Sequence, residues 1–411
     1  MSQVLQHVID AIGPASEVNA EAAQNRVVAA GATVLERLAR ALGGAQHSPV
    51  PRGTRRRIVV AVGDHGCGDP GLAMGADHPS VIAAREIAAG SAALCQIARS
   101  ANHTPIVIVD AGAREPGHMP DIAVSLGRGP SRDLMREPAM TIVDAVLGLE
   151  AGIALAISLT EPLTAAPLPS FEDMAIGTEP GVTPEATGLD ERAGVTQPMA
   201  GRAGVTQPIA GRAGVTQPIA GHASVTQPRA GHASVTQPTV GHPDAIEAAV
   251  GPALDAIALG AIGVGSEVAS AALLAAISGD VPGGLDDDLA EAAGVRGLEM
   301  RGASGLEVLA TFGGAETAVL AGLILGAASM NVPVILDSYA TGAAALVAAA
   351  MAPPVTGYLI AAHRGTFTHP AILAYLGLQP IFEVGLGHGE GTGAAMVLPL
   401  LDQVAAIASG R

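Results

Sequence analysis

Several residue types are scarce in this chain of 411 residues, which has no Trp, no Lys and only two Cys. Aromatic residues make up 2% of the sequence and apolar residues 49%, so a buried core has to be built from Ala, Val, Leu and Ile. Small side chains of this kind let helices and sheets approach closely, and a chain of this length can bury a sizeable core. Cys67 and Cys95 are too few for a disulfide framework, which predicts a reduced, cytoplasmic protein.

Basic side chains are also few, and the formal net charge is −17. An acidic chain repels phosphate backbones, and no Arg-rich run with interleaved aromatics offsets this charge, so we expect no nucleic-acid partner. The one basic cluster, at residues 52–57, holds four arginines directly before an apolar run. We interpret it as a solvated entry to a strand rather than as a phosphate-binding patch.

Neither a signal peptide nor a membrane span is predicted. The N-terminal MSQVLQHVIDAIGP lacks a basic segment, and its apolar run is interrupted. The longest Ala/Leu/Val-rich run, at about 319–351, is broken by Asn331, Pro333 and Asp337, whereas a span needs roughly 20 unbroken apolar residues. We therefore expect buried helices and strands, and no membrane partner.

Strand-like and helix-like segments alternate along the chain. The runs 58–62 and 105–109 are β-branched and lead into Gly-Asp and Asp-Ala-Gly, with a helical stretch at about 80–100 between them, which is the pattern of a βαβ unit. Further expected strands are AIALGAIGVG, VPVILD, YLIAAH and IFEVG, and further expected helices cover about 15–48, 137–157, a stretch from about Asp244, 268–278, 315–329, 340–352, 369–376 and 392–408. This alternation predicts an α/β fold with a mostly parallel sheet covered on both faces, whose ligands bind beyond the carboxyl ends of the strands.

Residues 192–241 repeat a decapeptide: RAGVTQPMAG, RAGVTQPIAG twice, HASVTQPRAG and HASVTQPTVG. A ten-residue period matches no common solenoid, and each unit holds Pro and Gly but little apolar mass. We interpret about 162–243 as a low-complexity insertion, a flexible surface loop, with a small repeat-built interaction module as the alternative. The expected organisation is then an N-terminal helical part at 1–50 and an α/β domain at 51–161 and 244–411, with the insertion between its two parts.

The loop GDHGCGDPGLAMGADHP, at 63–79, carries several residues that can bind ligands. Two His and three Asp could suggest a metal site, but their spacing fits no standard signature, and Asp is common in Gly-rich loops because it caps turns. We favour a substrate-facing loop. The residues concerned are Asp64, His65, Asp69, Asp77 and His78.

The loop GAIGVGSEV, at 260–268, lies between an expected strand and helix. Gly263 and Gly265 would let backbone N–H groups face an anion at the start of the helix. A carboxylate at Glu267 suits the helix dipole but would repel a phosphate placed there. A tight packing turn, capped by Ser266 and Glu267, is equally compatible with the sequence.

The loop GLGHGEGTG, at 385–393, surrounds His388 and Glu390 with five glycines. Backbone that rich in glycine can approach a ligand closely. A lone acid held against apolar surroundings can have a raised pKa and accept a proton. The alternative for Glu390 is a solvated carboxylate in a turn.

These stretches together resemble a known family. GEGTGAAMVLPLL, from Gly389, and FGGAETAVLAGLILGAA, from Phe312, are similar to motifs of the nicotinate-nucleotide:dimethylbenzimidazole phosphoribosyltransferases. VPVILDSYATGAAALVA and YLIAAHRGTFTHPAILAYLGLQPIFEVGL resemble the family in order and spacing, as do VVAVGDHG, VIVDAGA and REPAMTIVDAVLGLEAG upstream. The resemblance covers about 20–160 and 244–408.

The resemblance implies a Rossmann-like three-layer α/β domain with a small helical domain built from the chain ends, acting as a homodimer without a metal or cofactor. It implies that ribose 5-phosphate moves from nicotinate mononucleotide to dimethylbenzimidazole or a related base, giving α-ribazole phosphate and nicotinate for the nucleotide loop of cobalamin. Glu390 would be the general base that takes the proton of the attacking base, and the phosphate would lie on the turn of Gly263, Gly265 and Ser266. The other implied substrate-binding residues are Asp64, His65, His78, Glu86, Gly389 and Gly391.

The glycine turn departs from the family pattern, which usually reads GEMGIGNTT. Here Ala261 replaces an acid, Ser266 replaces Asn, and Glu267 replaces Thr. A negative charge beside a phosphate is unfavourable in a low-dielectric pocket, although solvent screens it. The sequence therefore leaves two interpretations: an active phosphoribosyltransferase, or a catalytically weak paralogue acting as a binding or regulatory subunit, paired with an active relative.

Other departures lie outside this turn. His78 and Glu86 stand where Ser and Gln are usual beside the slot for the base. The usual basic residue downstream of GLDD is missing, and Arg296 or Arg301 would have to substitute for it.

Overall fold

The strands in the described part of this computed structural model form one six-stranded sheet in the order β3-β2-β1-β4-β5-β6, and their pairings are parallel. The structure describes residues 1–28, 31, 33–68, 71–120, 124–126, 128–160, 254–281, 288–387 and 389–410. The predicted insertion at 162–243, its repeats and the helix expected from about Asp244 lie outside these residues. The strands are β1 Arg56–Gly63, β2 Ile106–Gly112, β3 Val124–Ser125, β4 Ala256–Ile262, β5 Val334–Leu336 and β6 Leu359–Ala361.

The order of the strands reverses between β1 and β4. From β1 the chain proceeds to β2 and β3 on one side, and from β4 to β5 and β6 on the other. In open parallel sheets this reversal leaves a crevice outside the carboxyl ends of the two central strands, where ligands bind. The predicted α/β fold with its mostly parallel, Rossmann-like sheet is confirmed. The loops that follow Gly63 and Ile262 form the edge where a ligand is expected, and we call this edge the crevice.

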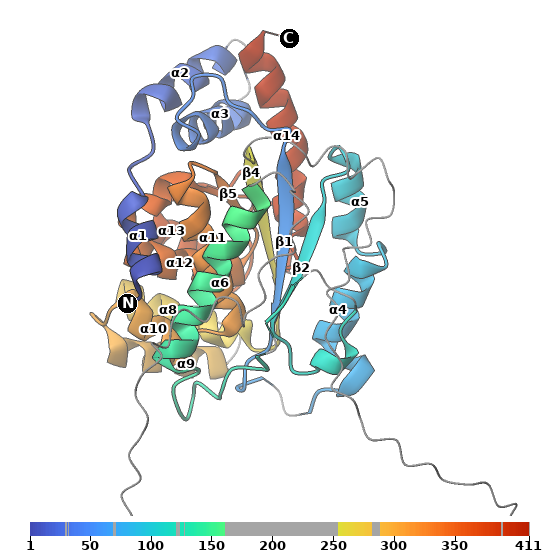
Figure 1. Ribbon diagram of the computed structural model, residues 1–411, viewed down its shortest axis with the longest axis vertical. Helices are drawn as coiled ribbons and strands as arrows, with labels where there is room; N and C mark the ends of the chain where they lie inside the picture. Colours follow the sequence, from blue (N-terminus) through green and yellow to red (C-terminus); the bar gives the residue numbers. More distant parts are fainter. Residues whose placement is uncertain are drawn as a thin grey trace, which may run out of the picture. The chain divides into compact units, whose positions relative to one another are not determined.

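The helices cover both faces of this sheet (Figure 1). They are α1 Gln3–Ala11, α2 Glu17–Val27, α3 Thr33–Ala45, α4 Pro79–Ala88, α5 Ala93–Ser100, α6 Ile142–Thr160, α8 Ser266–Ser278, α9 Asp288–Gly297, α10 Gly305–Phe312, α11 Ala315–Ser329, α12 Tyr339–Met351, α13 His369–Leu376 and α14 Thr392–Ser409. Helices α4, α5 and α14 lie on one face, and α6, α8, α11 and α12 on the other.

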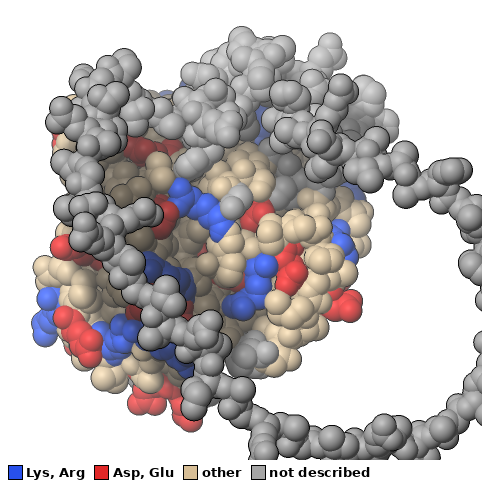
Figure 2. Space-filling view, turned by 60° about the horizontal axis from the view of Figure 1, so that its bottom comes forward, with Lys and Arg blue, Asp and Glu red and all other residues tan. Residues whose placement is uncertain are grey.

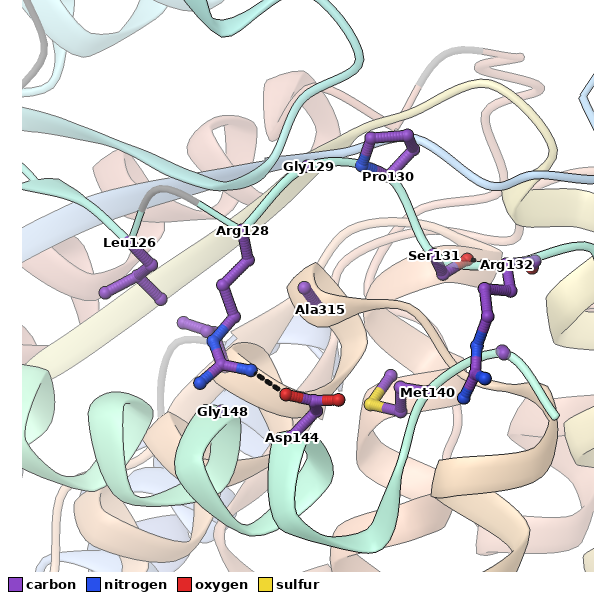
Figure 3. Close-up of a pocket in the computed structure, with 12 residues that line it drawn as sticks. Leu126, Arg128, Gly129, Pro130, Ser131, Arg132, Met140, Asp144, Gly148 and Ala315 are labelled. Atoms are coloured by element: carbon purple, nitrogen blue, oxygen red, sulfur yellow. Dashed lines mark hydrogen bonds and ion pairs between the residues drawn. The ribbon is translucent and has the colours of Figure 1, made fainter. Parts of the chain in front are cut away.

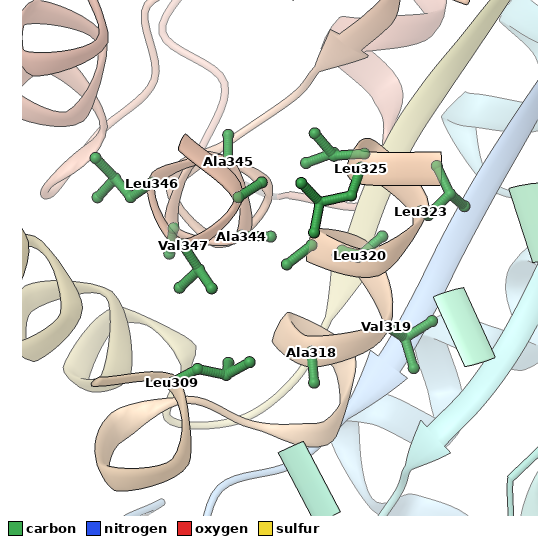
Figure 4. Packing of buried hydrophobic residues seen from close by; sticks show 14 of the residues in the cluster. Leu309, Ala318, Val319, Leu320, Leu323, Leu325, Ala344, Ala345, Leu346 and Val347 are labelled. Carbon is green, nitrogen blue, oxygen red and sulfur yellow. The ribbon is translucent and has the colours of Figure 1, made fainter. Parts of the chain in front are cut away.

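The alternation of side chains along β1 divides the core into two layers. Ile58, Val60 and Val62 join the cluster with α4, α5 and α14, whereas Val59 and Ala61 join the cluster with α6, α8 and α11. Figure 4 shows part of this second layer, in which the labelled side chains of α10, α11 and α12 are all Ala, Val or Leu. The scarcity of aromatic residues is thus met by close aliphatic packing.

Glycines set the contact between α6 and α11. A Cβ added to Gly152 of α6 would lie 2.0 Å from the carbonyl oxygen of Val319, and one added to Gly322 of α11 would lie 2.0 Å from the carbonyl oxygen of Leu149. Both positions meet backbone, which cannot move aside as a flexible side chain can. The two helices therefore touch backbone to backbone.

The two ends of the chain come together, as the resemblance implied. Helices α2 and α3 pack against α14 (Figure 1). The Arg26 guanidinium donates to the carbonyl oxygen of Ala408 over 3.2 Å. Helices α2 and α3 and the end of α14 form one helical layer, whereas α1 packs against α6 and α11.

Three sequence predictions about elements were wrong in detail. The helices expected at 15–48 and 80–100 are each two helices, because the chain turns at Gly31 and Gly90, whose φ angles of +63° and +73° are left-handed. The expected strand IFEVG forms only one bridge, between His363 and Phe382. Two residues further along this segment, the Val384 carbonyl accepts from the ring of His363 over 3.1 Å instead of from a strand amide. Helices α1, α9 and α10 and the short strand β3 were not predicted.

The arginine cluster at 52–57 is not simply solvated, which corrects the sequence interpretation. Arg56 is 2% exposed and donates to both carboxylate oxygens of Asp402, over 2.9 and 2.8 Å. It also donates to the carbonyl oxygens of Gly53 and Ala101. Arg56 therefore connects the start of β1 to α14, because the several N–H donors of its guanidinium bind carboxylate and carbonyl oxygens at the same time.

Three helical segments are long and apolar enough, by length and composition, to cross a membrane: Pro79–Ser100, α6 and α14. The first is two helices, with the turn at Gly90 between them. Helix α6 buries Leu149 and Ile153 in one layer of the core, and α14 buries Leu398 in the other. Each segment packs only part of its apolar side chains into the core, and Ile82, Ile142, Val143 and Ile157 are exposed.

Candidate functional site

Asp64 ties together the loops at the carboxyl ends of the central strands. Its Oδ1 accepts from the Val264 amide over 2.9 Å and from the Ser80 hydroxyl over 2.5 Å, and its Oδ2 accepts from the Arg114 amide over 2.8 Å. The side chain is 1% exposed. Figure 2 turns this end of the molecule forward and shows Arg, Asp and Glu side chains interspersed over it. Asp64 therefore joins the loops at this edge of the sheet, and both of its carboxylate oxygens already accept hydrogen bonds from the protein.

His65 lies beside Asp64 and forms a buried pair with Glu316, the second residue of α11. The His65 Nε2 and Glu316 Oε1 atoms are 2.9 Å apart, and the two side chains are 0% and 2% exposed. The Glu316 Oε1 also accepts from the Thr317 hydroxyl over 2.8 Å, whereas its Oε2 is buried without a hydrogen bond. The other ring nitrogen, Nδ1, is 3.3 Å from the Ser131 hydroxyl.

Burial disfavours the charged form of both His65 and Glu316, but the attraction between their opposite charges outweighs this effect on the two pKa values. Burial alone would lower the pKa of His65, but the charge and hydrogen bond of Glu316 hold it above the ordinary 6.5. Burial alone would raise the pKa of Glu316, but His65 holds it below the ordinary 4.5. We therefore interpret the two side chains as an imidazolium–carboxylate pair.

This pair should make stability depend on pH. The raised pKa of His65 contributes stability that is complete below about pH 6.5 and is lost as pH rises through the folded value, and the lowered pKa of Glu316 contributes stability that is complete above about pH 4.5. We expect the difference in the free energy of unfolding between wild type and Glu316→Gln to be largest near pH 5.5 and smaller near pH 9. Urea titrations at both values measure this difference. An equal difference at both would contradict the charged pair.

The predicted glycine turn does adopt a conformation that only glycine accepts readily. Gly265 has φ +86° and caps the start of α8, and a Cβ added to Gly263 would lie 2.0 Å from the carbonyl oxygen of Gly63. Ser266 is buried, and its hydroxyl donates to the Gly263 carbonyl over 3.1 Å; no side chain caps the start of the helix. The turn therefore packs tightly against the β1 loop and places the start of α8 at the crevice.

Glu267 faces across the crevice, toward α12. Its Oε2 is 3.5 Å from the Tyr339 hydroxyl, a long hydrogen bond, and its side chain is half-buried. Burial and the neighbouring Glu267 charge raise the pKa of Tyr339 above its usual range. The carboxylate thus lies between the loops that follow β4 and β5.

Glu390 is half-buried, and its backbone is fixed against the middle of β4. A Cβ added to Gly260 would lie 2.5 Å from the Glu390 carbonyl carbon, and the Gly389 carbonyl accepts from the Ala261 amide over 2.7 Å. Burial raises the pKa of the Cys95 thiol in α5; the Glu390 charge acts in the same direction, and the Arg99 charge in the opposite one. Glu390 is therefore on the side of the sheet covered by α4, α5 and α14.

Asp337, at the end of β5, holds the loop that carries Glu390. Its two oxygens accept from the amides of Gly391 and Ala394, over 3.0 and 2.7 Å. Gly391 has φ +97° and caps the start of α14. Burial raises the pKa of Asp337 to about 6, although the two amides and His363, 3.8 Å away, act in the opposite direction.

The structure brings some of the remaining predicted residues together and not others. His78 caps the start of α4 and is buried, with its Nδ1 3.9 Å from Asp64. Glu86 is exposed two turns along α4. Arg301 lies against Gly279, at the opposite end of α8 from Gly265, and Arg296 donates to the Met135 carbonyl over 2.9 Å. Neither arginine lies at the glycine turn in these contacts, and His388 lies outside the described residues.

Sequence reasoning missed Glu316, Asp337 and Tyr339 as parts of this site. The signals present were an acid directly after FGGA and an Asp at the end of an apolar strand. Among the described residues, no group of three or more His, Cys, Asp or Glu side chains is arranged to hold a metal ion. The site thus consists of separate carboxylates, and three of them, Asp64, Glu316 and Asp337, are paired with or close to buried histidines.

Comparison with known proteins identifies the family. A family model described as phosphoribosyltransferase (DBI_PRT) matches residues 12–179 and 240–410. A nicotinate-nucleotide–dimethylbenzimidazole phosphoribosyltransferase from Roseiflexus sp. (strain RS-1) is 30% identical over 97% of this chain and 92% of its own length. The chain belongs to this phosphoribosyltransferase family. It is thus a pentosyltransferase by family, as the sequence motifs predicted.

Other relatives of this phosphoribosyltransferase match in part or in fold. An enzyme of the same name from Chloroflexus aurantiacus (strain ATCC 29366 / DSM 635 / J-10-fl) is 40% identical over 166 residues, 37% of this chain and 47% of its own length. The crystal structure of CobT from Thermus thermophilus is 24% identical, with a TM-score of 0.63 over 95% of this chain and 96% of that chain. That likeness concerns the fold, and it agrees with the parallel sheet described above.

Proposed function

We propose that this phosphoribosyltransferase moves ribose 5-phosphate from nicotinate mononucleotide to dimethylbenzimidazole or a related base, releasing nicotinate. The product would be α-ribazole phosphate, for the nucleotide loop of cobalamin. In this reaction a nitrogen of the base attacks the anomeric carbon, the bond from that carbon to the nicotinate nitrogen breaks, and the ring of the base becomes cationic until it loses its N–H proton. The reaction needs an acceptor for that proton and a site for the phosphate.

The position of Glu390 is the observation that carries this proposal. Its carboxylate is on a half-buried, glycine-rich segment whose backbone is anchored by β4 and by Asp337. A carboxylate held in place can take the proton from the ring and stabilise its positive charge. Small apolar side chains of the surrounding helices suit a flat bicyclic base, which needs an apolar slot.

We propose that the phosphate binds at the start of α8, over Gly265. A helix that begins at a left-handed glycine presents backbone N–H groups and the positive end of its dipole to an anion. In this proposal His78, Ser266 and Gly391 are further substrate contacts, and Asp64 and His65 support the site through their hydrogen bonds. We also propose that the enzyme is a cytoplasmic homodimer.

Glu267 favours a second candidate function. Its half-buried carboxylate lies in the first turn of α8, beside the proposed phosphate, where two anions would compete. A chain with a weakened phosphate site would serve as a binding or regulatory subunit of an active relative. The Tyr339 hydroxyl partly balances this charge, since it donates to Glu267.

One experiment separates the two functions. Calorimetric titration with nicotinate mononucleotide, followed by chromatography of a reaction with dimethylbenzimidazole, should show micromolar-range binding and release of nicotinate by the wild type. Glu267→Thr should then bind about as tightly. If the wild type neither binds nor turns over the nucleotide and Glu267→Thr restores binding, the regulatory function replaces the catalytic one. If neither protein binds, the proposed phosphate site is wrong.

A further inference from the structure

A cavity opens near the β2 and β3 side of the sheet, away from the Glu390 segment. It has a volume of about 290 Å³ and lies among the segment after β3, the start of α6 and the start of α11 (Figure 3). Glu390 contacts β4, whereas this cavity borders the β2 and β3 side of the sheet. Its walls are formed by Leu126, Arg128, Gly129, Pro130, Ser131, Arg132, Ala139, Met140, Asp144, Gly148, Ala315 and Val319.

The cavity combines apolar walls with cationic side chains. Met140, Val319 and Ala315 supply apolar surface, while Arg128 and Arg132 approach from two sides (Figure 3). Helices α6 and α11 both begin here, so the positive ends of their dipoles point at the same space. A ligand with an apolar body and a negative charge matches these walls.

One carboxylate also borders the cavity, and it is already neutralised. Asp144 pairs with Arg128, and its Oδ2 accepts from the hydroxyl and amide of Thr141, which caps α6. These hydrogen bonds lower the pKa of Asp144, so it stays ionised and bound to its partners. Arg132 is 45% exposed, and its pair with Glu137, over 3.3 Å, is exposed on both sides and weak. Arg132 is thus the cation that a ligand can recruit.

Ser131 joins the wall of the cavity to the buried pair of His65 and Glu316. Because the Glu316 carboxylate accepts from Nε2, a charged His65 ring directs Nδ1–H at the Ser131 oxygen, 3.3 Å away. The hydroxyl proton is then left to donate elsewhere. Its other contact, the Arg132 carbonyl at 3.5 Å, is long for an O–H···O bond. The chain Glu316–His65–Ser131 therefore presents a hydroxyl donor to the cavity.

We propose that this cavity binds a small carboxylate with an apolar ring, held by Arg132 and the Ser131 hydroxyl and packed against Met140 and Val319. The proposal does not depend on phosphoribosyl transfer. The His65 amide also donates to the Val264 carbonyl over 2.9 Å. An occupant bound to Ser131 would therefore be linked to the glycine turn through Ser131 and His65. The site is thus suited to modulate the crevice.

Calorimetry with benzoate tests this site, with benzamide as the neutral probe of the same shape. We expect saturable binding of benzoate and at least tenfold weaker binding of benzamide. Ser131→Ala and Arg132→Gln should each weaken benzoate binding about tenfold, the usual size of one hydrogen bond to a charged group. Ser100→Ala, an exposed serine at the end of α5, should leave it unchanged.

Three results would overturn the proposal. The first is no saturable binding of benzoate. The second is equal binding of benzoate and benzamide, which would describe an apolar hole without anion recognition. The third is displacement of benzoate by nicotinate mononucleotide with no effect of Ser131→Ala, which would place benzoate in the substrate crevice. Benzoate binding that survives in Glu390→Gln, whatever the activity of that variant, separates this test from the proposed function.

Discussion

Replacing Glu390 with Gln should lower the turnover of nicotinate mononucleotide with dimethylbenzimidazole by about 10²–10⁴, the usual contribution of a general base. Gln is nearly isosteric and keeps a hydrogen-bond acceptor, but it cannot take the proton or balance the positive ring. Because the backbone of this segment is fixed by β4 and Asp337, the fold should remain intact. Steady-state kinetics measure the loss, and it should fall on kcat more than on KM for nicotinate mononucleotide.

Glu383→Gln is the matched control. Glu383 precedes the same glycine-rich segment, but it is 67% exposed and pairs with Arg364 at the surface. Turnover close to wild type is expected for it. Near-wild-type turnover in Glu390→Gln itself would mean that another group accepts the proton.

Gly152→Ala should destabilise the protein by about 3 kcal/mol, near the upper end for overpacked cores. The new methyl group would lie 2.0 Å from the Val319 carbonyl oxygen and 2.6 Å from the Leu323 nitrogen, so α6 and α11 must separate. Separation opens gaps among the aliphatic side chains of that layer, which lose contacts with one another. Urea unfolding followed by circular dichroism measures the loss of free energy.

Gly117→Ala controls for the change in the backbone. An added Cβ at Gly117 meets nothing within 4 Å, and the residue is exposed. Its free energy of unfolding should stay within about 0.5 kcal/mol of wild type. If Gly152→Ala behaves in the same way, the two helices are not held at backbone contact.

The layered fold could be predicted because its pattern is local. The β-branched runs that lead into Gly-Asp and Asp-Ala-Gly predicted β1 and β2, and α11 and α13 have the bounds expected from the sequence. The turns at Gly31 and Gly90 could not be predicted, because a glycine within a helical pattern is often tolerated as helix. The strand expected at IFEVG failed for a different reason: a buried histidine takes the carbonyl that a strand partner would need.

The site was predictable only where one segment holds the signal. Glu390 is conspicuous because it is a lone acid among glycines. Glu316 lies in an apolar helix, and its partner His65 is 251 residues away, so no local pattern connects them. The burial of Arg56 likewise depends on Asp402, at the far end of the chain.

The two thiols give this protein internal reporters of local opening. Both are free and buried, and burial, with the nearby Asp133 charge, raises the pKa of Cys67 to about 12. Because the thiolate is the reactive form, alkylating reagents should scarcely modify Cys67 until the loops over it part. Cys67 lies under Gly265 at the crevice, and Cys95 lies in α5 on one face of the sheet. Mass spectrometry can measure the alkylation rate of each thiol separately. Comparing the two rates therefore compares how often the loops over Cys67 open with how often α5 opens.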